Sequence, residues 1–111
     1  MIVTPSAEVS GHRTVRTLGL VYGNTIRARH VGKDILAAFK NLVGGELQEY
    51  TKLMAESREQ AVDRMIASAK GMGANGIINV RFTTSYIMNN ASEILAYGDA
   101  VMLEREPGPA L

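Results

Sequence analysis

Residues 70–82, KGMGANGIINVRF, join a helical pattern to a strand pattern through a cluster of glycines. Within them, Gly71 to Gly76 spells G-x-G-x-x-G, the spacing of a phosphate-binding loop. Such a loop needs a strand before it and a helix after it, because the helix N-terminus must point at the phosphate. Here the helical pattern comes first, so the amides lie at a helix C-terminus, which carries partial negative charge. The stretch therefore predicts a helix C-cap, with Gly71 or Gly73 in the left-handed conformation.

The pattern upstream of this joint is helical. Residues 46–72 place a series of residues three or four apart on one stripe, which predicts a single long amphipathic helix. The stripe consists of Leu47, Tyr50, Met54, Arg58, Ala61, Met65, Ala69 and Met72. Before it, residues 35–43 predict a short helix that ends at Gly44-Gly45.

The pattern downstream of the joint is a β-hairpin. Residues 77–88 and 91–103 are strand-like, and Asn89-Asn90 is the natural two-residue turn because asparagine tolerates positive φ. The register set by that turn pairs Met88 with Ala91, Phe82 with Tyr97, Val80 with Asp99, and Ile78 with Val101. One face of the hairpin is then apolar, which predicts a core face against the long helix. Its members are Ile78, Val80, Phe82, Leu95, Tyr97 and Val101.

The N-terminal third predicts strands. Residues 2–4 form a short apolar run that Pro5 ends, and residues 12–28 are rich in β-branched side chains. The imperfect alternation in 12–28 indicates a bent or bulged strand. Two alternatives stay open: one long kinked strand, or a hairpin that turns at Gly23-Asn24.

Composition bounds the class of protein. A chain of 111 residues predicts one domain with a modest core. We expect that domain over residues 1–104 and a flexible, proline-containing tail over 105–111. The formal net charge of +1 gives no reason to expect nucleic acid or an anionic membrane as a partner. The absence of cysteine excludes thiolate metal sites. With no secretory N-terminus and no apolar run of about 20 residues, a soluble cytoplasmic protein is the expectation.

Two histidines are the candidate metal ligands. On one long strand His12 and His30 would lie too far apart to share an ion, at a rise of about 3.3 Å per residue. A hairpin or a subunit boundary would bring them together. Because neither arrangement is required, we favour the simpler interpretation of solvated or half-buried histidines.

Three other polar residues are candidates for ligand binding. In the predicted register Asp99 points into the apolar face, where a carboxylate needs partners or a proton. We favour a position near the sheet rim or facing a solvated channel, with hydrogen bonds from Asn75 or Asn79, over a metal or ligand carboxylate. Arg27 and Arg29 share a strand face and would form a ring of positive charge in an oligomer. Solvated or salt-bridged arginines are the simpler alternative.

Several segments carry a family resemblance. Residues 23–82, with ARHVGKD, LVGGELQEYT and GANGIINVRF, followed by AYGDAV in the last strand, resemble the YbjQ-like family of small bacterial proteins. The resemblance covers nearly the whole chain. It implies an α+β subunit of β-α-β-β type in two layers, similar to a dodecin subunit, with one long helix packed on an antiparallel sheet. It also implies assembly as a ring-shaped homopentamer.

The family is often titled heavy-metal-binding, which would make a metal ion the cofactor. With no cysteine and two histidines, this chain offers little for soft metals. The family pattern also has threonine or another small residue at the position of Asp99, which argues against a family-wide role for this carboxylate.

Three function classes remain open. The first is a non-enzymatic homo-oligomeric module that binds a small ligand or metal ion, or acts as a scaffold, at subunit contacts or in a central channel. Unpaired edge strands would join its copies, and a heterologous contact of that kind closes into a ring. The alternative is an enzyme acting on a small polar substrate between subunits, although no catalytic constellation is evident. The third is an accessory protein with a protein partner, which a contiguous exposed apolar patch would indicate.

Overall fold

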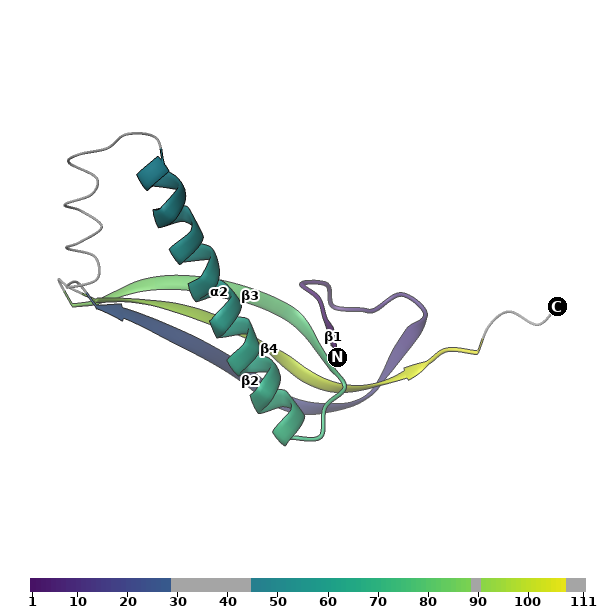
Figure 1. Ribbon diagram of the computed structural model, residues 1–111. Coiled ribbons are helices and arrows are strands. Elements are labelled where there is room, and N and C mark those ends of the chain that lie inside the picture. Colours follow the sequence, from purple (N-terminus) through teal and green to yellow (C-terminus); the bar gives the residue numbers. More distant parts are fainter. Residues whose placement is uncertain (29–44, 89–90, 108–111) are drawn as a thin grey trace.

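The computed structural model describes residues 1–28, 45–88 and 91–107. The elements in chain order are β1 (Ile2–Val3), β2 (His12–Ala28), α2 (Gly45–Gly71), β3 (Gly76–Met88) and β4 (Ala91–Arg105). The strands form one four-stranded sheet in the order β1-β3-β4-β2, and α2 crosses one face of it (Figure 1). The α+β class and the two layers are therefore confirmed. The helix predicted over 35–43 and the turn at Asn89-Asn90 lie outside the described residues.

The sheet is mixed rather than antiparallel. The pairs β2–β4 and β3–β4 are antiparallel, but β1 pairs in parallel with β3, placing Ile2 opposite Gly76 and Val3 opposite Ile77. The prediction of an antiparallel sheet is wrong at this edge. The hairpin pattern gave no information on β1, because a two-residue strand has too short a pattern to choose its neighbour.

β2 is one long strand, so the alternative of a hairpin at Gly23-Asn24 is wrong. Register shifts between Thr14 and Arg16 and between Thr17 and Gly19 mark bulges, which confirms the bent strand predicted from its imperfect alternation. Gly23 is not a turn residue. A Cβ atom there would overlap the carbonyl oxygen of Ala61, so this glycine allows the backbone of β2 to approach the helix closely.

The C-terminus of α2 ends in a Schellman cap at Gly73. Gly73 has a φ of 84°, its N–H donates to the carbonyl of Lys70 over 3.0 Å, and the N–H of Ala74 donates to the carbonyl of Ala69 over 3.0 Å. These are the two bonds of the motif, with the left-handed residue just past the helix. The predicted C-cap is confirmed, and of the two candidate glycines it is Gly73 that carries the left-handed conformation.

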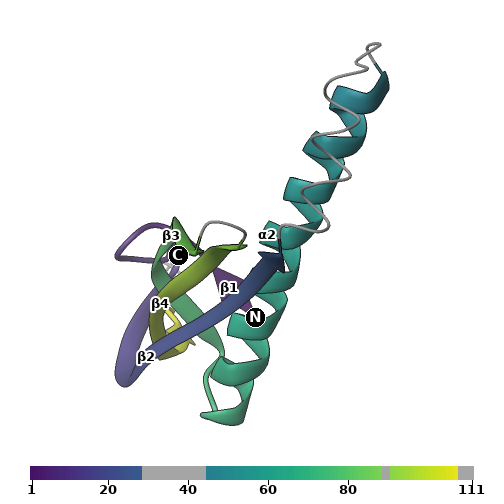
Figure 2. The same cartoon turned by 90° about the vertical axis from the view of Figure 1, so that its left-hand side faces the viewer.

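Only part of the predicted stripe of α2 is buried, and Met72 at its end is 40% exposed. Ala61, Met65 and Ala69 are fully buried, whereas Arg58 is exposed and Ser57 takes the buried place. The hydroxyl of Thr25 donates to the carbonyl of Ser57 over 3.1 Å, so a polar pair joins helix and strand here. In Figure 2 the helix lies over the β2 side of the sheet, and its N-terminal half projects beyond the strands.

The hairpin begins in the predicted register and then leaves it. Met88 pairs with Ala91 as predicted, but shifts between Tyr86 and Met88 and between Ile78 and Arg81 move the later pairs. Phe82 consequently faces Ala96 rather than Tyr97. At the second shift Asn79 has a φ of 55°.

The second bulge changes which residues of β3 form the core. Ile77 and Val80 both pack in the cluster under α2, although strict alternation would put them on opposite faces. Phe82, predicted as core, is 53% exposed. Ile78 and Val101 are buried on the other side of the sheet, in a smaller cluster with Leu103.

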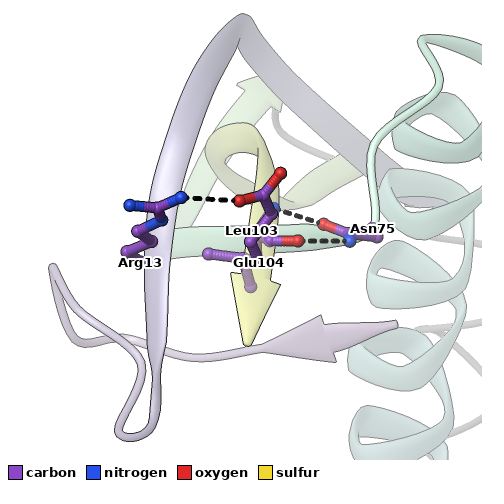
Figure 3. Close-up of polar contacts among 4 residues, drawn as sticks. All are labelled: Arg13, Asn75, Leu103 and Glu104. Carbon is purple, nitrogen blue, oxygen red and sulfur yellow. Dashed lines mark hydrogen bonds and ion pairs between the residues drawn. The ribbon is translucent and has the colours of Figure 1, made fainter. Parts of the chain in front are cut away.

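Two polar contacts hold the far end of β4. The side-chain amide of Asn75 pairs with the backbone of Leu103: its Nδ2 donates to the carbonyl over 2.9 Å, and its Oδ1 accepts from the N–H over 2.7 Å (Figure 3). Next to it, Arg13 Nη2 lies 2.9 Å from Glu104 Oε2. Because both side chains of this ion pair are more than half exposed, it adds at most about 1 kcal/mol.

Candidate functional site

The centre of the sheet face turned away from α2 is apolar, and no element in the described part of the chain covers it. Along β2, Leu20, Tyr22 and Ile26 are 67%, 61% and 56% exposed. Leu20 and Tyr22, together with β4, surround a shallow hollow with a volume of about 430 Å³. We call this surface the open face; its hollow is lined by Leu20, Tyr22, Asn24, Glu93, Leu95 and Tyr97.

Strand alternation builds the open face. In β2, Val21 and Thr25 point toward α2 and are buried, so the residues between them point the other way. Tyr22 lies directly opposite Tyr97 in the β2–β4 register. Cross-strand aromatic pairs of this kind contribute about 0.2–1 kcal/mol, and they leave ring faces available to a further group.

One polar pair lies among these apolar side chains. Asn24 Nδ2 donates to Glu93 Oε2 over 2.8 Å, in a part-buried position. An ionised carboxylate has more acceptor positions than this single bond uses. The open face therefore offers apolar ring surface together with one acceptor for a hydrogen-bond donor. Its lining holds a carboxylate, an amide and two phenols, a set suited to binding and positioning.

Among the predicted site residues that the structure describes, His12 and Arg27 lie far apart on β2. His12 pairs with Arg105 at one end of β2, and Arg27 pairs with Ser92 toward the other end. At about 3.3 Å per residue, some fifteen residues of strand separate them by tens of ångströms. The side chain of Arg27 lies outside the described residues, as do Arg29 and His30 entirely.

His12 and Asp99 have ordinary hydrogen-bond partners. The Nδ1 of His12 lies 3.0 Å from the carbonyl oxygen of Ser10, and the ring is half-buried. Asp99 accepts a hydrogen bond from Asn79 Nδ2 over 2.9 Å and is half-buried on the side away from α2. Of the two predicted hydrogen-bond donors to Asp99, Asn79 is therefore the one observed. Asn75 binds the backbone of Leu103 instead.

A heavy-metal site does not fit the described part of one chain. In residues 1–28, 45–88 and 91–107, no group of three or more histidine, aspartate or glutamate side chains is placed to hold an ion. The sequence contains no cysteine to supply a thiolate. Soft metals select sulfur ligands, so this donor set is a poor match for them.

The sequence reasoning missed the open face because it treated Gly23-Asn24 as a possible turn. The signal that marks this face is the alternation of Leu20, Tyr22 and Ile26 at every second position around that site. Read as a continuous strand, this pattern places three large apolar residues on one face. Only the position of α2 shows that this face is the uncovered one.

Fold and site together define a small two-layer α+β protein with a bare sheet face and no catalytic constellation among its described residues. The sequence model of the YbjQ family, whose description reads "Putative heavy-metal-binding", matches residues 1–104. The chain belongs to this family.

Relatives of the chain come from both bacteria and archaea, which corrects the expectation of a bacterial family. A UPF0145 protein of Dehalococcoides mccartyi is 57% identical over 104 residues, covering 94% of this chain and all of that protein. A UPF0145 protein of Archaeoglobus fulgidus is 52% identical, covering 93% of this chain and 95% of the relative. One of Photobacterium profundum is 50% identical, covering 93% of this chain and 100% of the relative.

A solved structure shares the fold. The crystal structure of a protein of unknown function from Pediococcus pentosaceus, assigned to the DUF74 family, aligns with a TM-score of 0.61 at 14% identity. The alignment covers 94% of this chain and 98% of that one. At this identity the likeness concerns the fold alone. Separately, no helix in the described ranges combines the length and apolar character needed to cross a bilayer.

Proposed function

We propose that the chain works as a non-enzymatic, homo-oligomeric binding module that holds a small, apolar-surfaced ligand on its open face. The observation that carries this proposal is the open face itself. Three large apolar side chains of β2 are each more than half exposed there, and two of them line a hollow that contains one carboxylate. Contiguous exposed apolar surface on a small protein marks an interaction site.

The shape of the chain supports assembly with further copies. A compact domain of this length has a radius of gyration of about 13 Å, whereas that of the chain is 18.3 Å. The extents of 64 × 30 × 18 Å describe an elongated body, from which α2 projects beyond the sheet (Figure 2). Within the described ranges, much of the helix and sheet of a single copy therefore lacks the packing that a neighbour would supply.

We propose a closed ring, with the open face of each sheet on its inner wall. Five copies is the number that the resemblance to the family implies. In such a ring the hollows of the separate copies face a shared central space, and the ligand binds there or at the contacts between copies.

The metal function in the family's description is a weaker candidate for this chain. The described residues of one copy provide no ligand cluster, so a metal site would have to combine residues of neighbouring copies. His12 is the described histidine available for such a site, because its Nε2 is not used in a hydrogen bond to Ser10.

Native mass spectrometry of protein purified without a metal-affinity tag tests the proposal. We expect a single assembly of identical copies with the mass of a pentamer and without a retained metal. A folded single copy at high dilution would contradict the oligomeric module. A retained metal ion that disappears in the His12→Ala variant would replace the apolar-ligand proposal with a metal function.

A further inference from the structure

The sheet has two outer edges that differ in how well they are protected. Edge strands expose unpaired N–H and C=O groups, and proteins block unwanted pairing there with charges, prolines, bulges or covering segments. Among the residues that the structure describes, some stretches of the two edges have such protection and others have none. The unprotected stretches show where another strand is accepted.

On the β3 edge, protection ends at Arg81. The N-terminal half of β3 is covered by β1 and the residues after it: Val80 N–H donates to the carbonyl of Thr4, and Asn79 N–H donates to that of Ser6. Arg81 Nη1 donates to the carbonyl of Pro5 over 2.8 Å. From there, residues 82–88 (FTTSYIM) contain no charge and no proline, and no described strand pairs with their outer side.

On the β2 edge, protection ends at Gly19. The N-terminal half of β2 contains both bulges and two arginines, Arg13 and Arg16. Residues 20–26 (LVYGNTI) are in regular register with β4 and contain no charge and no proline. The sheet order places no described strand on their outer side. Two uncharged seven-residue segments therefore lie on opposite edges of the same sheet.

The two segments lie at the same position along the strand direction, and their chains run in the same direction. Glu93 of β4 pairs with Ile26 on one side and with Ser85 on the other, so these residues are level across the sheet. β2 and β3 are both antiparallel to β4, and are therefore parallel to each other. A copy related by rotation about an axis along the strands would thus bring its segment 82–88 beside segment 20–26 of its neighbour.

We infer that residues 82–88 of β3 pair in parallel with residues 20–26 of β2 in the next copy, so that the sheets join edge to edge around the assembly. This inference rests on the oligomer proposed above and identifies the surfaces that form it. Because the two edges differ, the contact is heterologous, and repetition of it produces a closed ring when the rotation permits.

The position of α2 supports pairing between unlike edges. The helix packs mainly on β2 and then on β4, so β3 has little helical cover and Phe82 is 53% exposed on that side. Between α2 and β3 lies a groove with a volume of about 530 Å³. Its lining residues are Ala55, Arg58, Glu59, Val62, Asp63 and Phe82. A neighbour that docks through its own β2 would bring its helix over Phe82 and this groove, whereas two β3 edges paired together would bring no helix there.

The charges on the two flanks of α2 are complementary. The groove flank carries Glu59 and Asp63 beside a single arginine, Arg58. On the opposite flank, Arg64 Nη1 donates to the carbonyl of Asn24 in β2 over 2.6 Å. In the inferred arrangement Arg64 of one copy approaches the acidic flank of the next, and opposite charges of this kind fix register and suppress wrong partners.

Cysteine cross-linking tests the strand pairing, and the natural absence of cysteine leaves only the introduced thiols to react. Ile26→Cys and Ser85→Cys are combined in one chain. Within a copy these positions lie on either side of β4, about 9–10 Å apart. That separation exceeds the Cα distance of about 4.4–6.8 Å that a disulfide requires. A second double variant, Ile26→Cys with Thr83→Cys, covers a neighbouring register.

We expect mild oxidation of a double variant to yield a covalent ladder that extends beyond the dimer, with no cross-link in any single-cysteine variant. Dimers from Ser85→Cys or Ile26→Cys alone would show pairing of like edges and overturn the inference. An oligomer by native mass spectrometry that gives no ladder from either double variant would overturn it as well, while leaving the proposed oligomer intact. Single copies by native mass spectrometry would overturn the proposed function itself.

A charge at Phe82 provides a second test that does not depend on register. Because Phe82 is more than half exposed within a copy, Phe82→Lys should keep the circular dichroism spectrum of the fold. We expect this variant to dissociate at protein concentrations where the unmodified assembly persists. Val15→Lys is the matched control, since Val15 is 46% exposed on the bulged part of β2, and it should leave assembly unchanged. An intact assembly in Phe82→Lys would contradict the placement of a helix over this residue.

Discussion

Gly23 of β2 lies directly against Ala61 of α2. A Cβ atom at position 23 would overlap the carbonyl oxygen of Ala61 and the amide nitrogen of Met65. Both helix residues are fully buried, and their backbone atoms cannot move aside as a flexible side chain would. The contact of strand and helix backbones at this point sets the spacing between the two layers.

We predict that Gly23→Ala destabilises the fold by about 3 kcal/mol, at the upper end of what overpacking in a core costs. Urea unfolding at a fixed protein concentration measures the change, because assembly makes apparent stability depend on concentration. Gly71→Ala is the control: no atom lies within 4 Å of a Cβ built there. Equal stability of the two variants would mean that β2 and α2 are not in this close contact.

The Schellman cap leads to a second prediction. Gly73 has a φ of 84° in open space, so Gly73→Ala meets no neighbour but forces alanine into the left-handed region. We expect a loss of about 1–2 kcal/mol in the free energy of unfolding. Gly71→Ala, at the helix end without positive φ, should be neutral or stabilising by up to about 1 kcal/mol. Stabilisation by Gly73→Ala would be incompatible with the cap.

Local chemistry explains which parts of the fold the sequence predicted. The helix over residues 46–72 and its glycine cap depend on residues close together in the chain, and the structure has both within a residue. The phase of β3 was mispredicted because the bulge at Asn79 is supported in part from outside the hairpin: the N–H of Asn79 donates to the carbonyl of Ser6. The pattern of the hairpin alone does not contain Ser6.

The open face could not be predicted from the sequence for a similar reason. The alternation of Leu20, Tyr22 and Ile26 was visible, but the uncovered face is determined by the lateral position of α2 on the sheet. That position follows from the close approach at Gly23, which the sequence reasoning considered as a turn residue. Phe82 was misplaced for the same reason, since helix and strand phases were assigned separately.

The bulge at Asn79 gives a third prediction. Asparagine tolerates a φ of 55°, and glycine tolerates it better, whereas a β-branched residue does not. We expect Asn79→Gly to cost about 1 kcal/mol or less, through the lost hydrogen bond to Asp99. We expect Asn79→Val to cost about 2–3 kcal/mol through backbone strain. Asp99→Ala separates the two effects, because it removes the same hydrogen bond and leaves the bulge residue unchanged. Thermal unfolding measures the loss of stability. An equal loss in Asn79→Val and Asn79→Gly would refute a requirement for positive φ at this position.

The open face supplies the last prediction. If Tyr22, opposite Tyr97, provides ring surface for an apolar ligand, then Tyr22→Ser should weaken binding of the neutral apolar dye Nile red several-fold. The side chain is 61% exposed, so its loss should change stability by about 0.5 kcal/mol or less. Val15→Ser removes an exposed apolar side chain elsewhere on β2 and should leave dye affinity unchanged, as measured by fluorescence titration of assembled protein. Equal weakening in both variants would indicate nonspecific adsorption, and unchanged affinity in Tyr22→Ser would place the ligand on another surface.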